Sequence, residues 1–252
     1  SYIVRSVHEL LQTEFGLKHG LADTTTWGEM MKRHPGLKLP PLTDEPGETR
    51  TIDASEPFVQ ILDPATGTAT FPVEVIDVIF KHLEAQWQSG GLAVMPDLKP
   101  TGTMPRSFEA YWNLYVPQAL LPRLHGYELM MAPYAIAHMK IGLKLSETGY
   151  RFGTEERARI YLTNALEPWM KQLPLIGFDA LAHESAAVNE IKRHKRFTVV
   201  IGNPPYSPSI CEPEWLMRRL DDWKQGLNET KSDLNREEWK FLRLAQHQCT
   251  IT

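Results

Sequence analysis

Several features that would place the chain in a specialised class are missing from its 252 residues. Only two cysteines occur, Cys211 and Cys249, and they form neither a CxxC pair nor a metal-ligand pattern with histidine. This argues against a disulfide framework and against a zinc site. No apolar run approaches the roughly 18 residues of a membrane span, and the first residues lack the basic-then-apolar order of a secretory signal. We therefore expect a cytoplasmic protein with no bound metal and no membrane partner.

An excess of positive charge is also missing. Lysine and arginine number 27 against 31 acidic residues, a formal charge of −4, whereas a self-sufficient DNA-binding protein usually carries a net basic face. If DNA is the substrate, much of the binding surface lies elsewhere. An initiator methionine is absent and the opening residues already have a helical pattern, so we expect neighbouring segments that are not in this sequence.

What is present is ordinary globular composition, with 42% hydrophobic and 23% charged residues. Apolar residues at helical spacing predict a first helix over about residues 2–15, and Gly16 stands where a helix end favours a left-handed residue. Residues 17–57 are rich in proline, which predicts a long irregular connection without another regular element. We assign 1–57 to an N-terminal helix and connection that pack on the core, and 58–252 to a partial catalytic core.

From residue 58 onward, strand patterns alternate with helix patterns. This alternation predicts an α/β, Rossmann-like fold with a mainly parallel sheet and helices on both faces. The tail predicts two more helices, the second with Asn235 as a possible N-cap, but no fifth strand, so the fourth strand is left with an unpaired edge and the fold is expected to be incomplete. The predicted strands are 58–62, 124–128, 160–163 and 197–201, and the predicted helices are 71–88, 107–121, 131–147 and 181–195.

The first sequence pattern that carries chemistry is Asp63–Phe71, where a strand runs into small residues and then into a helix. Small residues let the backbone approach a ligand closely, the helix start offers free N–H groups, and Asp63 places an acceptor at the strand tip. The segment lacks GxxxxGK[ST] and a strict GxGxxG, which argues against a nucleoside triphosphate and against a hydride-transfer cofactor. Alone, it also fits a tight turn without a ligand.

The second pattern is Asn203-Pro204-Pro205-Tyr206, which follows the fourth strand. Two prolines fix the backbone and aim its carbonyls, Asn203 adds a side-chain acceptor and Tyr206 adds an aromatic face. The Asn203 amide oxygen and the Pro204 carbonyl can accept both hydrogens of an adenine 6-amino group, while Tyr206 stacks on the flipped base. A proline-rich turn with a packed tyrosine is the structural alternative.

Both patterns end strands that we expect to flank the switch point of an open α/β sheet, where ligands bind. Glu128 ends the second strand, where it could hold ribose hydroxyls, although a surface carboxylate is the alternative. Asn164 and Ala165 follow the third strand, where a cofactor adenine could be bracketed. All these residues are predicted to meet at one edge of the sheet.

The order of the two patterns, Asp63–Gly67 before Asn203–Tyr206, resembles the γ-type DNA adenine amino-methyltransferases. Segments 121–138 and 161–167 further resemble the methyltransferase region of Type ISP enzymes, which join nuclease, helicase, methyltransferase and target-recognition parts in one chain. The resemblance implies transfer of a methyl group from S-adenosylmethionine to the 6-amino group of an adenine flipped out of duplex DNA. It implies catalytic Asn203, Pro204, Pro205 and Tyr206, and cofactor-binding Asp63, Pro64, Ala65, Gly67, Thr70, Phe71, Glu128, Asn164 and Ala165.

The sequence departs from that family in two places. Ala69 stands where the family usually has glycine, a change expected to be tolerable if φ stays negative there. The Thr-Pro pair that normally precedes the first helix is absent. Two other interpretations stay open: a protein-glutamine or RNA-guanine amino-methyltransferase of the same fold, and a non-catalytic cofactor-binding fragment.

A basic run, Lys192–Arg196, lies just before the fourth strand. It could contact phosphate near the acceptor site, but a solvated helix end is the commoner use of such a run. The nine histidines show no HExxH spacing, and we interpret His125 and His138 as structural.

Overall fold

The centre of the protein is a four-stranded parallel sheet. The computed structural model describes residues 2–42, 49–98, 104–153, 156–167, 179–205 and 237–248. The strands are β1 (Ile61–Asp63), β2 (Leu124–Glu128), β3 (Arg159–Leu162) and β4 (Val199–Val200). Their order is β3-β2-β1-β4 and every pairing is parallel. The predicted α/β fold with a parallel sheet is confirmed.

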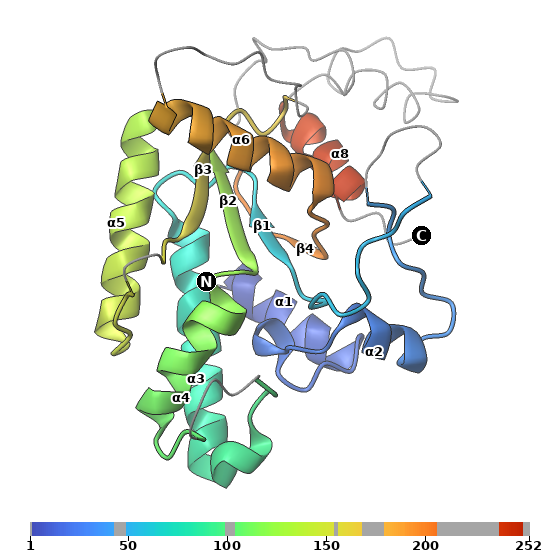
Figure 1. Ribbon diagram of the computed structural model, residues 1–252, viewed down its shortest axis with the longest axis vertical. Coiled ribbons are helices and arrows are strands. Elements are labelled where there is room, and N and C mark those ends of the chain that lie inside the picture. Colours follow the sequence, from blue (N-terminus) through green and yellow to red (C-terminus); the bar gives the residue numbers. More distant parts are fainter. Residues whose placement is uncertain are drawn as a thin grey trace.

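Helices cover both faces of this sheet (Figure 1). Strand residues alternate between two apolar cores: Ile61 and Ile160 belong to one, Leu62 and Tyr161 to the other. This period of two buries both faces, as a parallel sheet requires. The first core is closed by α1 (Tyr2–Thr13), α3 (Thr70–Gly90), α4 (Phe108–Tyr115) and α5 (Met131–Glu147), and the second by α6 (Asp179–His194) and α8 (Glu237–Gln248). The fold is Rossmann-like.

The predicted element boundaries agree with the structure in some elements and differ from it in others. The ranges 124–128 for β2 and 131–147 for α5 agree with the structure. β1 and β4 are shorter than predicted, because residues before them pair with other partners: the Phe58 N–H donates to the Thr25 carbonyl at 2.8 Å, and the Gln60 N–H to Thr198 Oγ1 at 3.0 Å. Asn235 and the first tail helix lie outside the described residues, and within them β4 has β1 as its one strand partner.

The segment 17–57 is more ordered than its composition suggests. It contains a 3-10 turn, η1 (Gly20–Ala22), and a helix, α2 (Trp27–Arg33), so the prediction of no regular element there is wrong. A capping box starts α2: the Glu29 N–H donates to Thr26 Oγ1 at 3.3 Å, and the Thr26 N–H to Glu29 Oε2 at 2.8 Å. Trp27 is 1% exposed within the first core. Gly16 has φ +64°, which confirms the left-handed helix end.

A buried arginine ties this N-terminal segment to the sheet. Arg123 is 2% exposed and immediately precedes β2. Its Nη1 donates to the Asp23 carbonyl at 2.6 Å and to the Val59 carbonyl at 3.4 Å, and its Nη2 donates to the Tyr115 hydroxyl at 2.7 Å. Its Nε donates to the Ala119 carbonyl. One guanidinium therefore joins the N-terminal segment, the approach to β1, α4 and the π-helical turn η3 (Val116–Leu120).

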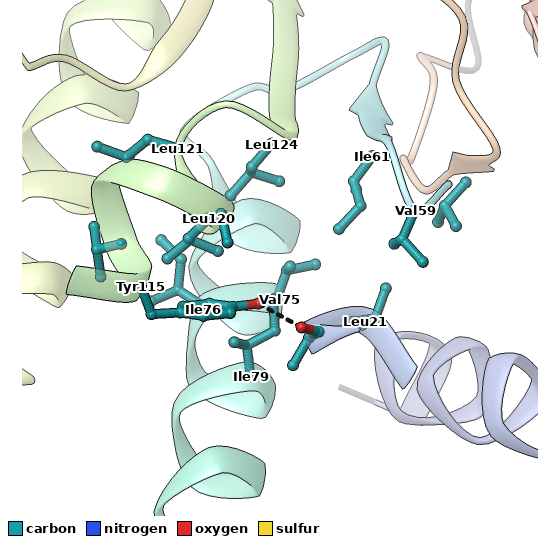
Figure 2. Close-up of a cluster of buried hydrophobic side chains, with 14 of the residues drawn as sticks. Leu21, Val59, Ile61, Val75, Ile76, Ile79, Tyr115, Leu120, Leu121 and Leu124 are labelled. Carbon is teal, nitrogen blue, oxygen red and sulfur yellow. Dashed lines mark hydrogen bonds between the residues drawn. The ribbon is translucent and has the colours of Figure 1, made fainter. Parts of the chain in front are cut away.

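The Tyr115 ring extends this junction into the first apolar core. Figure 2 shows it among Val75, Ile76 and Ile79 of α3, with its hydroxyl directed at a backbone carbonyl. That carbonyl belongs to Ala22, and the hydroxyl donates to it at 2.8 Å. A buried tyrosine hydroxyl needs such a partner. The remaining short element, η2 (Gly91–Val94), follows α3 directly.

We expect Arg123→Met to destabilise the fold by at least about 3 kcal/mol, because it leaves several buried acceptors without donors. Chemical denaturation monitored by circular dichroism measures this loss. Arg33→Met is the matched control: Arg33 is an exposed arginine in the last turn of α2, and its loss should change stability by less than about 0.5 kcal/mol. Equal effects of the two substitutions would contradict the role given to Arg123.

Candidate functional site

The loop that follows β1, which begins at Asp63, and the loop that follows β4, which contains Asn203, meet at the carboxyl edge of the sheet. The chain leaves β1 at Asp63 and leaves β4 toward Gly202, and a Cβ at Gly202 would lie 2.8 Å from Asp63 Oδ1 and 3.1 Å from Pro64 Cδ. β1 and β4 are neighbours although β2 and β3 lie on the other side of β1, so the switch point of the sheet lies between β1 and β4. The predicted meeting of these two strand ends is confirmed.

Asp63 is a buried carboxyl group, with 2% of its surface exposed. Its Oδ1 accepts the Ala65 N–H at 3.1 Å, and its Oδ2 is buried without a partner among the described residues. Burial raises the pKa of Asp63 to about 7, and the nearby Glu128 carboxylate adds to the rise while the Ala65 N–H opposes it. The site therefore presents a buried oxygen that lacks a donor.

The loop after Asp63 is fixed to the end of β2. Thr66 donates its hydroxyl to the Asp63 carbonyl at 3.1 Å and its N–H to the Tyr127 carbonyl at 2.9 Å. Gly67 has φ +55° and its N–H donates to Glu128 Oε2 at 2.8 Å. The loop thus has a defined shape, with backbone N–H groups and small residues facing the edge of the sheet.

Ala69 corrects a sequence-based expectation. Its φ is +61°, and it is the one described residue other than glycine with a positive φ, so the condition under which alanine was expected to be tolerable is not met. It is also fully buried at the N-cap position of α3. An L-residue in the left-handed region costs about 1–2 kcal/mol. The chain adopts there the conformation that a glycine would adopt freely.

Glu128 joins two loops rather than lying free on the surface. It is 7% exposed. Its Oε2 accepts the Gly67 N–H and its Oε1 accepts the Met130 N–H, both at 2.8 Å. Each carboxylate oxygen has lone pairs for a further donor, so ribose hydroxyls remain possible ligands. The ribose-binding role stays a prediction.

The end of β3 lies beside the same edge. The Thr163 N–H donates to the Glu128 carbonyl at 2.8 Å. Asn164 is engaged in its own turn, since its Oδ1 accepts the Leu166 N–H at 3.0 Å and its carbonyl accepts Lys192 Nζ at 2.6 Å. Ala165 is 7% exposed in the second core. The structure brings these two residues to the predicted edge, but their role toward an adenine ring stays a prediction.

The remaining predicted cofactor residues begin α3. Thr70 is exposed in the first turn, Phe71 is half-buried against the first core, and Pro72 is buried. The proline has no N–H to leave unpaired in the first turn of a helix. Of the two predicted cofactor residues, Thr70 has a side chain outside the core, whereas the Phe71 side chain packs against the core.

The predicted acceptor loop directly follows β4. Asn203 and Pro205 are exposed and Pro204 is half-buried. The Ile201 N–H donates to the Leu62 carbonyl at 2.9 Å, which extends the β1–β4 contact up to this loop. Tyr206 lies outside the described residues.

The basic run Lys192–Arg196 is largely used within the protein. Lys195 Nζ pairs with Glu56 at 3.0 Å, and Arg196, 7% exposed, donates its Nε to the Pro41 carbonyl at 3.0 Å. These contacts fasten the end of α6 to the N-terminal segment. Neither the phosphate-binding nor the solvated interpretation describes these two residues.

Two glycines of the site were not recognised from the sequence. Gly202 is one. The other is Gly126, inside β2, where a Cβ would lie 2.3 Å from Thr66 Oγ1 and 2.8 Å from Ile160 Cδ1. A glycine within a strand is a signal of close approach by another chain segment, and this signal could have identified Gly126.

The described residues offer neither a metal site nor a membrane-spanning helix. They contain no group of three or more histidine, cysteine, aspartate or glutamate side chains arranged to hold a metal ion. None of their helices combines the length and the apolar character needed to cross a membrane.

Comparison with solved structures supports the fold. The ATP-dependent Type ISP restriction-modification enzyme LlaBIII bound to DNA matches with a TM-score of 0.63 and 21% identity over 99% of this chain. The DrdV–DNA complex gives 0.57 and 21% over 99%. A nuclease-deletion mutant of the Type ISP enzyme LlaGI with a DNA substrate mimic gives 0.53 and 19% over 91%. The known protein-family profiles and the curated proteins give no match.

These neighbours are much longer than this chain. It spans 14% of the LlaBIII chain, 16% of the LlaGI chain and 18% of the DrdV chain. At such identities the similarity establishes a shared fold, and a fold does not determine a function.

We expect Gly126→Ala to destabilise the protein by about 1–3 kcal/mol or more, because the added methyl group collides with Thr66 Oγ1 and disturbs the Asp63 loop. Gly142→Ala is the matched control. Gly142 lies within α5 with nothing within 4 Å of an added Cβ, so this substitution should stabilise by about 0.5–1 kcal/mol. Thermal denaturation of both variants compares them; a neutral Gly126→Ala would contradict the tight contact.

We expect Asp63→Asn to stabilise the ligand-free protein in a pH-dependent manner. The folded-state pKa lies above the ordinary value of 3.8, so the folded protein loses stability as pH rises from about 4 to about 7 and the carboxyl ionises. The Asp63→Asn variant has no carboxyl group to ionise at this position, so it does not lose stability in this way. Its advantage over the natural sequence should be larger at pH 8 than at pH 5 by about 2–3 kcal/mol. Denaturation at both pH values measures it, and an advantage independent of pH would refute the buried charge.

Proposed function

We propose that this chain is the catalytic region of a DNA adenine methyltransferase that forms part of a restriction-modification enzyme. One observation carries the proposal: the loop that begins at Asp63 and the loop that contains Asn203 leave adjacent strands at the switch point. The two loops come into close contact at Gly202, since any Cβ there would meet the side chains of Asp63 and Pro64. A donor of a small group on the first loop and its acceptor on the second would therefore face each other.

The residues of the first loop fit S-adenosylmethionine. Asp63 Oδ2 is buried and lacks a donor, and the ligand carries donors and positive charge. Ala65 and Gly67 leave room for close approach, and Glu128 retains lone pairs for hydroxyl groups. When bound, this cofactor supplies a methyl group activated by a positively charged sulfur.

The second loop would hold the methyl acceptor. Asn203 Oδ1 and the Pro204 carbonyl are proposed to accept the two hydrogens of an adenine 6-amino group, which raises electron density on the nitrogen. With S-adenosylmethionine bound, Asn203 and Pro204 would hold this nitrogen in position to receive the methyl group, and the surplus proton would leave the amine for solvent. Pro205 stiffens the loop, and Tyr206 is proposed to stack on the flipped base.

The wider context supports DNA as the substrate. The three structural neighbours are complexes with DNA or a DNA mimic, and two are Type ISP restriction-modification enzymes. The formal charge of −4 means that this chain supplies little of the general attraction to phosphate. We propose that duplex DNA is gripped largely by nuclease, helicase and target-recognition parts fused to this region in a longer polypeptide.

We expect Asn203→Ala to lower methyl transfer by about 100-fold or more while leaving the affinity for S-adenosylmethionine unchanged, because the side chain acts on the amine. Transfer of a tritiated methyl group into duplex DNA, by the polypeptide that carries this region, measures the rate, and calorimetry measures the affinity. Gln88→Ala, an exposed polar residue near the end of α3, is the control and should alter neither.

The same assay distinguishes the competing functions. Label in protein glutamine or RNA guanine instead of DNA adenine would replace the proposed substrate. Saturable cofactor binding without transfer to any acceptor would indicate a non-catalytic binding fragment. Equal loss of binding and transfer in Asn203→Ala would contradict the role of that residue.

A further inference from the structure

The two carboxyl groups at the ends of β1 and β2 differ in the number of hydrogen bonds that they accept. Glu128 accepts two backbone N–H groups at 2.8 Å, one on each oxygen. Asp63 accepts one, from Ala65 at 3.1 Å, and its Oδ2 has no partner among the described residues although the side chain is 2% exposed. Glu128 therefore has a hydrogen-bond donor on each oxygen, whereas Asp63 has a donor on Oδ1 alone among the described residues.

No positive charge of the described residues compensates Asp63. On α5, Lys140 Nζ lies 3.5 Å from Thr68 Oγ1, and Lys144 pairs with Asp77 of α3 at 2.6 Å. On α6, Lys192 donates to backbone carbonyls near the end of β3. The neighbour from the β4 side is Gly202, which has no side chain. Glu128 of β2 is the charged group that acts on Asp63, and it is negative.

A buried carboxyl group in such surroundings is a proton-binding group. Burial raises the pKa of Asp63 to about 7, so near neutral pH the free protein holds a proton there in a large fraction of molecules. A ligand that donates a hydrogen bond to Oδ2, or carries a positive charge beside it, favours the ionised form instead. Ligand binding and proton release are then linked.

We propose that S-adenosylmethionine binding expels a proton from Asp63, so that this buried carboxyl becomes the negatively charged partner of the ligand. The inference rests on the proposed function for the identity of the ligand. It adds a regulation that the function does not require: affinity that falls in acid because the ligand must displace a proton. Asp63 is then a sensor of pH within the cofactor site as well as a binding residue.

Calorimetric titration with S-adenosylmethionine in two buffers of different ionisation enthalpy, phosphate and imidazole, counts the protons released. At pH 6.0 we expect roughly 0.9 proton released per ligand bound, falling to roughly half at pH 7.0. The dissociation constant should be about ten-fold or more higher at pH 5.5 than at pH 7.0. The ligand's ammonium and sulfonium groups keep their charges over this range.

Infrared difference spectroscopy assigns the proton to a residue even where a variant binds poorly. The ligand-free natural protein at pH 6.0 should show the carbonyl band of a protonated buried carboxyl, which disappears on addition of S-adenosylmethionine. The ligand-free Asp63→Asn variant should lack that band. If the band persists in the variant, the proton belongs to another group and the proposal is overturned. The same holds if the variant still binds the ligand and still releases a proton.

The outcomes separate this inference from the proposed function. Saturable binding with equal heats in both buffers and no dependence of affinity on pH would overturn proton release and leave the methyltransferase proposal intact. Absence of saturable binding at pH 7.5, where Asp63 is mostly ionised, would overturn both.

Discussion

β1 is held between two parallel partners, and the position of every functional residue depends on that arrangement. Its three residues are all buried, β2 pairs along one edge and β4 along the other. Because parallel strands end at the same edge, the loops after β1, β2 and β4 are brought together there from distant parts of the chain. The loops after β1 and β4 come into contact at Asp63 and Gly202.

The amino edge of the sheet is organised by a different interaction, the buried guanidinium of Arg123. It binds carbonyls that the irregular segments before β1 leave unpaired. The ion pair between Lys195 and Glu56 attaches the end of α6 to the same N-terminal segment. Buried backbone carbonyls need donors, and a planar group with five N–H donors supplies several from one position. At the carboxyl edge, by contrast, Asp63 Oδ2 has no donor among the described residues.

Much of the fold could be predicted from hydrophobic periodicity, and the exceptions have physical causes. The bounds of β2 and α5 were predicted correctly, and the helical pattern of α5 extends over 17 residues. α2 was missed because proline-rich flanks hide a seven-residue helix, although Thr26 and Glu29 form a recognisable capping box. The positive φ of Ala69 could not be predicted, because it is imposed by the loop that Glu128 and Tyr127 hold in place rather than by local preference.

The site was predicted less completely than the fold. The sequence pattern predicts which residues stand at strand ends, but not that Asn164 is engaged in its own turn or that Asp63 lacks a second donor. The Asn164 turn is local, but the loop after Asp63 is shaped by hydrogen bonds between residues far apart in sequence, such as the one from the Gly67 N–H to Glu128 Oε2. The same holds for Gly126 and Gly202, whose lack of a side chain matters only because another loop comes within contact distance.

The placement of β4 beside β1 also has a consequence for synthesis on the ribosome. β2 and β3 follow β1 in order on one side, whereas β4 arrives 136 residues after Asp63, at Val199. A nascent chain that has emerged only through β3 can assemble three strands and the Asp63 loop, but one edge of β1 is still open to any other strand. β4 can pair with β1 only late in synthesis. The period of translation between β3 and β4 is therefore when this protein is most exposed to incorrect strand pairing.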